Sequence, residues 1–129
     1  MRVAIHGHDF HSKSSHFIED IIEQLHDRRA TVIVSDKVKK HLGDNTKSFD
    51  HKSGLDDVDY FVSIGGDGTL LESVTYIGKR EIPILGINAG RMGFLATISR
   101  EETENAIDLL CKGRLKIDTR SLLKLSSEP

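Results

Sequence analysis

The feature that most constrains the fold is a glycine-rich turn that follows a solid apolar run. Residues 60–64, Tyr-Phe-Val-Ser-Ile, are apolar enough to form a strand buried on both faces. Residues 65–69, Gly-Gly-Asp-Gly-Thr, come next, and apolar residues then recur at helical spacing until Gly78, where we expect the helix to end. A buried strand that turns directly into a helix indicates a parallel sheet covered by helices.

The turn also places an acidic side chain where a phosphate would fit. Backbone N–H groups at a helix N-terminus lack partners, and the helix dipole favours anions there. Asp67 would repel phosphate, so we expect it to hold Mg²⁺, accept a hydroxyl proton or hydrogen-bond a ribose hydroxyl, all of which indicate phosphoryl transfer. The alternative is that Asp67 caps the helix and the glycines only form a tight turn. The glycine spacing fits neither the phosphate loop nor the dinucleotide fingerprint.

A second glycine cluster follows another short apolar run. Residues 83–87, Pro-Ile-Leu-Gly-Ile, predict a buried strand that leads into residues 88–97, Asn-Ala-Gly-Arg-Met-Gly-Phe-Leu-Ala-Thr. Seven of the 11 glycines therefore lie between Gly65 and Gly93, at the ends of two successive strands. Ligands bind at such carboxyl ends in open α/β sheets. Phe94 could form an apolar wall for a flat ring, or it could simply anchor the loop in the core.

Together the two motifs resemble the N-terminal domain of the NAD kinase family. The turn at residues 65–69 alone is shared with diacylglycerol and sphingosine kinases and, in a close variant, with 6-phosphofructokinases. The second motif, Asn88-x-Gly90-x-x-Gly93-Phe94-Leu95, is much more specific to NAD kinases. The resemblance extends from the first strand to the end of the chain and is carried by these two segments. Met92 stands where leucine is usual, which is a conservative exchange.

The resemblance implies ATP-dependent phosphorylation of the 2′-hydroxyl of the adenosine ribose of NAD, giving NADP. ATP would come with Mg²⁺ or another divalent cation, and NAD would be the substrate. A carboxylate is a weak base toward an alcohol, so Asp67 could orient the hydroxyl or engage Mg²⁺ as well as accept the proton. Carried over by motif, the catalytic residue is Asp67 and the nucleotide-binding residues are Gly65, Gly66, Asp67, Gly68, Thr69, Asn88, Gly90 and Phe94.

The resemblance and the strand pattern together predict the domain organisation. Residues 1–114 are expected to form an α/β domain, an open, mostly parallel Rossmann-like sheet with helices on both faces. Residues 115–129 alternate apolar and polar, which is typical of a strand with one buried face, and would connect to the family's C-terminal all-β domain. That domain carries an Asn-Glu/Asp motif absent here, so we expect an N-terminal fragment, inactive alone. The family also implies a dimer or tetramer of the full-length protein.

The remaining elements follow from weaker patterns. Residues 3–5 and 31–34 are expected to be strands, and a helix begins after residues 14–15. Residues 36–59 are polar, so we expect a poorly ordered stretch with one short helix near residues 38–42. Ser99 and Glu102 form a capping box that predicts a helix start, and Gly113 predicts its end.

Charge and targeting signals narrow the class of protein. A formal net charge of -2 argues against binding to nucleic acid or an anionic membrane. No apolar run is long enough to span a bilayer, and residues 1–5 lack the pattern of a signal peptide, so we expect a cytoplasmic protein. Cys111 is the only cysteine and is expected to be buried on a helix. The lysines at 37, 39 and 40 are expected to form a solvated helix face.

Two further questions concern the role of the histidines near the N-terminus and the alternative functions of the protein. His6, His8 and His11 crowd the loop after the first strand and could bind Zn²⁺, but polar lining near the nucleotide is the preferred interpretation, and no metal site is assigned. A lipid or sugar kinase sharing the glycine turn is one alternative, which substrate selectivity would test. The other is a non-catalytic module that binds nucleotide without turnover.

Overall fold

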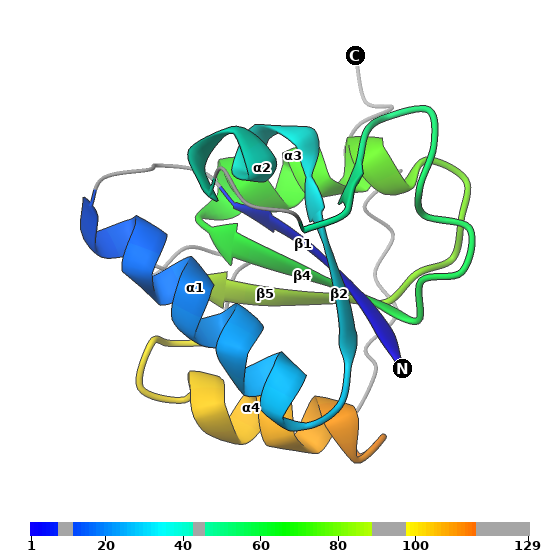
Figure 1. Ribbon diagram of the computed structural model, residues 1–129. Coiled ribbons are helices and arrows are strands. Elements are labelled where there is room, and N and C mark those ends of the chain that lie inside the picture. The colour runs from blue at the N-terminus through cyan, green and yellow to red at the C-terminus, as the bar shows by residue number, and fades with distance from the viewer. Residues whose placement is uncertain (8–11, 43–45, 89–97, 116–129) are drawn as a thin grey trace.

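The computed structural model describes residues 1–7, 12–42, 46–88 and 98–115, and in them five parallel strands form one sheet in the order β3-β2-β1-β4-β5 (Figure 1). The strands are β1 (Arg2–Gly7), β2 (Thr31–Ser35), β3 (Ser48–Phe49), β4 (Tyr60–Gly65) and β5 (Ile84–Asn88). The helices are α1 (Ser12–Asp27), α2 (Asp36–Leu42), α3 (Asp67–Ile77) and α4 (Thr103–Cys111). The predicted α/β class, with a parallel Rossmann-like sheet, is confirmed.

The strand order reverses beside β1, and this reversal positions the site. The chain builds outward from β1 to β2 and β3, then returns to the other side of β1 with β4 and β5. In the register, Val3 lies between Val32 and Tyr60, and Gly65 pairs with Asn88. The arrowheads of β1, β4 and β5 therefore meet at one edge of the sheet (Figure 1). In sheets of this kind that edge is where ligands bind.

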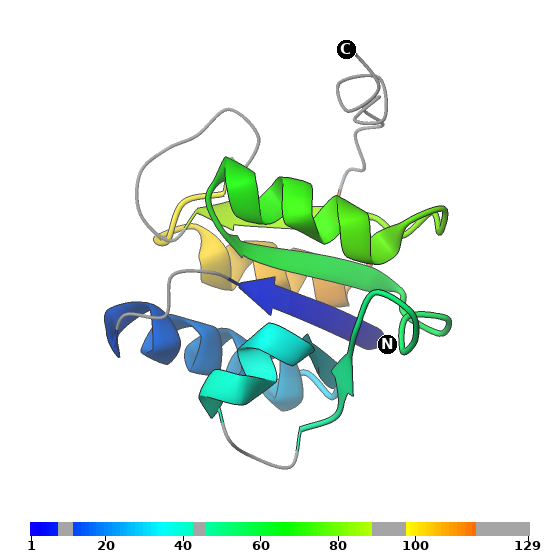
Figure 2. The ribbon, with the colours of Figure 1, turned by 90° about the horizontal axis from the view of Figure 1, so that it is seen from above.

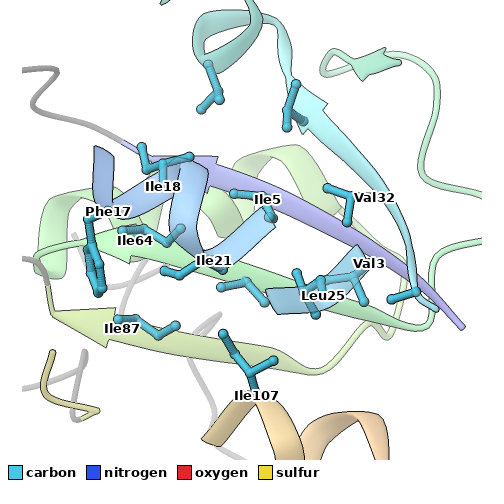
Figure 3. Close-up of a cluster of buried hydrophobic side chains, with 14 of the residues drawn as sticks. Val3, Ile5, Phe17, Ile18, Ile21, Leu25, Val32, Ile64, Ile87 and Ile107 are labelled. Carbon is cyan, nitrogen blue, oxygen red and sulfur yellow. The ribbon is translucent and has the colours of Figure 1, made fainter. Parts of the chain in front are cut away.

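One face of the sheet is covered by α1 and α4. Four α1 residues at helical spacing, Phe17, Ile18, Ile21 and Leu25, are buried there. Figure 3 shows these side chains directed at the sheet, and Ile107 of α4 beside Ile87. The predicted amphipathic helix is confirmed, although it begins at Ser12, earlier than expected.

The other face carries a second core beneath α3. Tyr76 and Ile77 of α3 pack there with Ala4, Ile33 and Phe61 of the sheet. Seen from above, α3 and α1 lie on opposite sides of β1 and β4, so helices cover both faces as predicted (Figure 2). Because both faces are covered, the inner strands are buried at consecutive residues rather than at alternate ones.

The expectation that residues 36–59 are poorly ordered is wrong in the part that the structure describes. The short helix exists as α2, but β3 and a packed segment follow it. Phe49 and Leu55 are 2% and 1% exposed, and Val58 is buried beside them. Single apolar residues separated by polar stretches have no period, so a pattern search misses them even though each one fills the core. Residues 43–45 lie outside the described part of the chain.

The helix ends agree with their sequence signals, with one exception. Gly78 and Gly113 adopt positive φ values of 63° and 68°, which glycine tolerates at a helix end because it has no Cβ. The backbone N–H of Ser99 donates to Glu102 Oε1 at 3.2 Å, so the expected pair forms. However, α4 begins only at Thr103, with Glu102 as its N-cap, so the predicted start at Ser99 is one turn too early.

Three further expectations concern single features. Cys111 is half-buried against the first core rather than fully buried, and burial raises the pKa of its thiol. Leu115 packs against the same core, whereas residues 116–129 lie outside the described residues, so the boundary at 114 stays a prediction. In the part of the chain described here, no helix has the length and apolar character required to cross a membrane.

The packing of the second core can be tested at Leu55. Leu55→Ala should lower the free energy of unfolding by about 2–4 kcal/mol, because a buried leucine leaves a cavity when truncated. Leu71→Ala is the matched control, since Leu71 is 45% exposed and its truncation should change stability by less than about 0.5 kcal/mol. Urea unfolding of both variants measures the difference. Equal effects would contradict a packed segment around Leu55.

Candidate functional site

The candidate site lies where β1, β4 and β5 end. Gly7 is adjacent to Ile64 in the register, and Gly65 is adjacent to Asn88. Asn88 is 3% exposed, and its backbone N–H donates to the Ile98 carbonyl at 2.7 Å. Two of the predicted site segments, the glycine turn and Asn88, are therefore brought side by side by strand pairing. Gly90 and Phe94 lie outside the described residues, as does Met92.

The first turn of α3 begins inside the glycine motif. Gly66 is the N-cap, Asp67 is the first helical residue, and the Leu70 N–H donates to the Gly66 carbonyl at 3.1 Å. The N-cap position is thus occupied by a glycine, which has no side chain to cap the helix. The alternative in which Asp67 only caps the helix stays a prediction. The half-buried Asp67 carboxylate lies at the positive end of the helix dipole.

The glycines of the motif differ in what surrounds them. A Cβ on Gly65 would lie 2.8 Å from the Cβ of Thr69, which is itself buried beneath the turn. Among the described residues outside its own helix and its chain neighbours, a Cβ on Gly66 or Gly68 would meet no atom within 4 Å. Gly65 is thus required by packing inside the protein. Gly66 and Gly68 instead leave open space beside the helix N-terminus, where a ligand could approach the backbone closely.

A polar network lies beside this turn, and its centre is His6. The side chain of His6 is fully buried near the end of β1, with Nδ1 2.8 Å from Ser35 Oγ and Nε2 2.6 Å from Glu72 Oε1. Because a carboxylate only accepts hydrogen bonds, Nε2–H donates to Glu72. Ser35 Oγ also accepts the N–H of Val38 at 3.2 Å. The network therefore links β1, β2, α2 and α3.

Glu72 receives a second donor from α2. Lys37 Nζ lies 3.1 Å from the same Oε1 atom that contacts His6. Burial would raise the pKa of Glu72, but the Lys37 hydrogen bond and the charge and hydrogen bond of His6 outweigh it, so the pKa lies below the ordinary value. The lowered pKa keeps Glu72 as a carboxylate, and its side chain is 26% exposed near the edge of the sheet.

Tyr76 forms a further link between the same two helices. Its hydroxyl donates to Asp36 Oδ1 at 2.7 Å, and its ring packs 4.8 Å from that of His6. Burial, followed by the hydrogen bond to Asp36, raises the pKa of Tyr76 well above its ordinary value. The imidazole of His51 stacks on the outer side of the ring with centroids 3.9 Å apart. Tyr76 is therefore a neutral, fixed hydrogen-bond donor.

The structure revises the interpretation of the histidines and lysines. His6 does not line a surface, because it is buried among protein partners; His8 and His11 lie outside the described residues. Lys37 is not simply solvated, since it pairs with Glu72. Sequence reasoning missed Glu72 and Tyr76, because they lie 66 and 40 residues from His6 and Asp36, their respective partners. No sequence pattern connects positions so far apart.

Comparisons with known proteins identify relatives of this chain. The family model described as the ATP-NAD kinase N-terminal domain matches residues 3–115. A curated NAD kinase from Christiangramia forsetii is 35% identical over 136 residues, covering 100% of this chain and 46% of the relative. One from Cytophaga hutchinsonii is 37% identical over 135 residues, covering 99% and 46%. The chain thus spans about half the length of these relatives.

A solved structure supports the fold separately. The crystal structure of yeast NADH kinase complexed with NADH superimposes with a TM-score of 0.76 at 21% sequence identity. The match covers 88% of this chain and 38% of the yeast chain. At that identity the likeness establishes the arrangement of the sheet and helices.

The different surroundings of the glycines predict opposite effects on stability. Gly65→Ala should lower the free energy of unfolding by about 1–3 kcal/mol, because its Cβ would overlap Thr69. Gly68→Ala should raise it by about 0.5 kcal/mol, because alanine is the better helix former and would meet no neighbour among the residues that the structure describes. Chemical denaturation of the two variants provides the comparison. Destabilisation by both would show that Gly68 is also confined.

The lowered pKa of Glu72 predicts a dependence of stability on pH. A carboxylate with a lowered pKa stabilises the folded state above its ordinary pKa, and this contribution is lost as the pH falls through the lowered value. Glu72→Gln should therefore unfold more easily than the unmodified protein by about 1 kcal/mol at about pH 5, and the gap should shrink toward about pH 3. Urea titrations across this range measure the gap. A constant gap would contradict the assignment.

Proposed function

We propose that this chain, which belongs to the ATP-NAD kinase family, forms the nucleotide-binding part of an enzyme that phosphorylates the 2′-hydroxyl of the adenosine ribose of NAD with ATP. The observation that carries this proposal is the position of Asp67. It is the first residue of α3, it follows the end of β4, and Asn88 ends the neighbouring strand. A carboxylate at a helix N-terminus flanked by open glycines can meet a hydroxyl and a phosphate together.

The chain's own groups have separate roles in this reaction. Asp67 orients the ribose hydroxyl and accepts its proton as the hydroxyl oxygen bonds to the γ-phosphorus and the bond to ADP breaks. The backbone N–H groups of Gly66 and Gly68 face the phosphates, where a side chain would obstruct them. Gly65 and Thr69 support the turn from below, and their close contact is consistent with that role. Asn88, Gly90 and Phe94 border the dinucleotide.

The divalent cation fits this site as a partner of the nucleotide. In the part of the chain that the structure describes, no three His, Cys, Asp or Glu side chains are grouped to hold a metal ion. Mg²⁺ commonly uses one or two carboxylates together with substrate phosphates and water, so a dedicated cage is not required. Asp67 is the residue that would contact Mg²⁺ bound to ATP, and the ion would neutralise phosphate charge there.

The wider organisation of the enzyme follows from the family. Residues 1–114 are the nucleotide-binding domain, and residues 115–129 connect it to a C-terminal β domain that completes the substrate site. The coverage of about half of each relative supports this division. We assign the enzyme to the cytoplasm and expect it to be a homo-oligomer, on the basis of the family resemblance. This chain alone is then inactive.

The proposal predicts that Asp67 is required for turnover. Asp67→Asn should reduce kcat for NADP formation at least about 100-fold, because it removes both the proton acceptor and the charge. The assay uses the complete gene product that carries these residues, with NAD and Mg·ATP, and follows NADP directly. Asp57→Asn is the matched control, because Asp57 is exposed just before the start of β4, at the opposite end of that strand from Asp67.

Two outcomes would contradict the proposal. If the folded Asp67→Asn variant formed NADP at the unmodified rate, Asp67 would not have the assigned role. If the unmodified protein formed no NADP, the NAD assignment would fail, and lipid and sugar acceptors would be tested next. Binding of NAD without any turnover would favour a nucleotide-binding module.

A further inference from the structure

We propose that Glu72 is a positioning residue: with His6 and Lys37 it holds α3 in place so that Asp67 stays aligned with the edge of the sheet. This inference rests on the proposed function, which gives Asp67 its catalytic role. It assigns a role to three side chains outside the glycine motif. They come from three different elements, namely β1, α2 and α3.

The geometry at Glu72 Oε1 is the first support. This single oxygen lies 2.6 Å from His6 Nε2 and 3.1 Å from Lys37 Nζ. The two donors approach from a central strand and from the start of a separate helix, so they constrain the oxygen from two sides. Glu72 follows Asp67 by five residues in the same helix, a distance of about 7.5 Å along its axis. Any shift of Glu72 is therefore transmitted to Asp67.

His6, the partner of Glu72 in this contact, is held rigidly in the sheet. His6 is fully buried, and β1 pairs with β2 on one side and β4 on the other. Its second ring nitrogen, Nδ1, is 2.8 Å from Ser35 Oγ, which also accepts the N–H of Val38. The imidazole is thus oriented by hydrogen bonds on both nitrogens. Glu72 is attached through it to the centre of the sheet.

A second contact one turn further along prevents α3 from pivoting. Tyr76 follows Glu72 by four residues, so both side chains project from the same face of the helix. The Tyr76 hydroxyl donates to Asp36 at 2.7 Å, and Asp36 is adjacent to Lys37 in α2. The first two residues of α2 therefore bind two successive turns of α3. Two attachment points fix both the position and the rotation of the helix.

The energetics favour a role in positioning over one in stability. Lys37 is 48% exposed in its pair with Glu72, and pairs of this kind contribute little to the free energy of unfolding. The apolar contacts of Tyr76 and Ile77 already hold α3 on the sheet. Such contacts are non-directional and allow small displacements, whereas hydrogen bonds define a register. Displacements of about 1 Å can cost up to about 100-fold in rate.

The test compares Glu72→Gln and Lys37→Met with the unmodified enzyme. His6 is left intact, because replacing a fully buried ring would disturb the core. Each variant should lower kcat about tenfold and change KM for NAD less than about twofold, because the displaced group acts in the reaction. Asp108→Asn is the matched control: Asp108 pairs with Arg28 and Lys112 on the opposite face of the sheet, and kcat should not change.

A double variant separates positioning from a general loss of structure. If Glu72 acts through Asp67, then Glu72→Gln in the Asp67→Asn background should change the residual kcat less than about twofold. A tenfold loss in that background would overturn the proposal, since the effect would not pass through Asp67. An unchanged kcat in both single variants would overturn it as well.

A measurement that does not depend on enzymatic activity keeps the test valid if the proposed function is wrong. Absence of NADP formation by the unmodified protein would reject the function alone. The amide NMR signals of Gly66 and Gly68 should then shift in the same direction in Glu72→Gln and Lys37→Met. If the lost charge acted directly on these amides, their shifts would have opposite signs in the two variants, because the two substitutions remove opposite charges. Shifts of opposite sign, or shifts no larger than those in Asp108→Asn, would overturn the positioning role.

Discussion

The arrangement of this protein depends on the burial of β1 at the centre of the sheet. Its apolar residues from Val3 to Ile5 are inaccessible to solvent, and the strand is paired on both edges. A strand enclosed on all sides forces the chain to build outward in both directions, which creates the reversal of strand order beside it. The carboxyl edge of the sheet becomes a functional surface because three strands then end together there.

At that edge the glycines of the turn are required for two different physical reasons. Gly65 allows the backbone of β4 to pass against Thr69, which is a packing requirement inside the protein. In the part of the chain that the structure describes, Gly66 and Gly68 have no neighbour at the position of a side chain, and Gly68 is in a helix where alanine would be more stable. A residue that is unfavourable for its own helix and unnecessary for packing is most simply explained by a ligand at this position.

The polar network around His6 has a different origin from the apolar core. Buried polar groups must be hydrogen-bonded to avoid a large cost, and His6 satisfies both ring nitrogens through Ser35 and Glu72. The network spans the boundary between the buried sheet and the exposed starts of α2 and α3. It therefore couples the rigid interior to the helix that carries Asp67. The network supplies a physical reason for a fixed geometry at this candidate site.

The sequence by itself determined the parallel α/β architecture, the C-terminal ends of α3 and α4 and the placement of the glycine turn and Asn88 at strand ends. Local signals were sufficient, because solid apolar runs, helical spacing and terminal glycines each reflect short-range physics. Only the tertiary structure decided the packing of Phe49 and Leu55 and the contacts of His6, Glu72 and Tyr76. These depend on which strand lies beside which, and side chains 66 residues apart in sequence meet only after the sheet has formed.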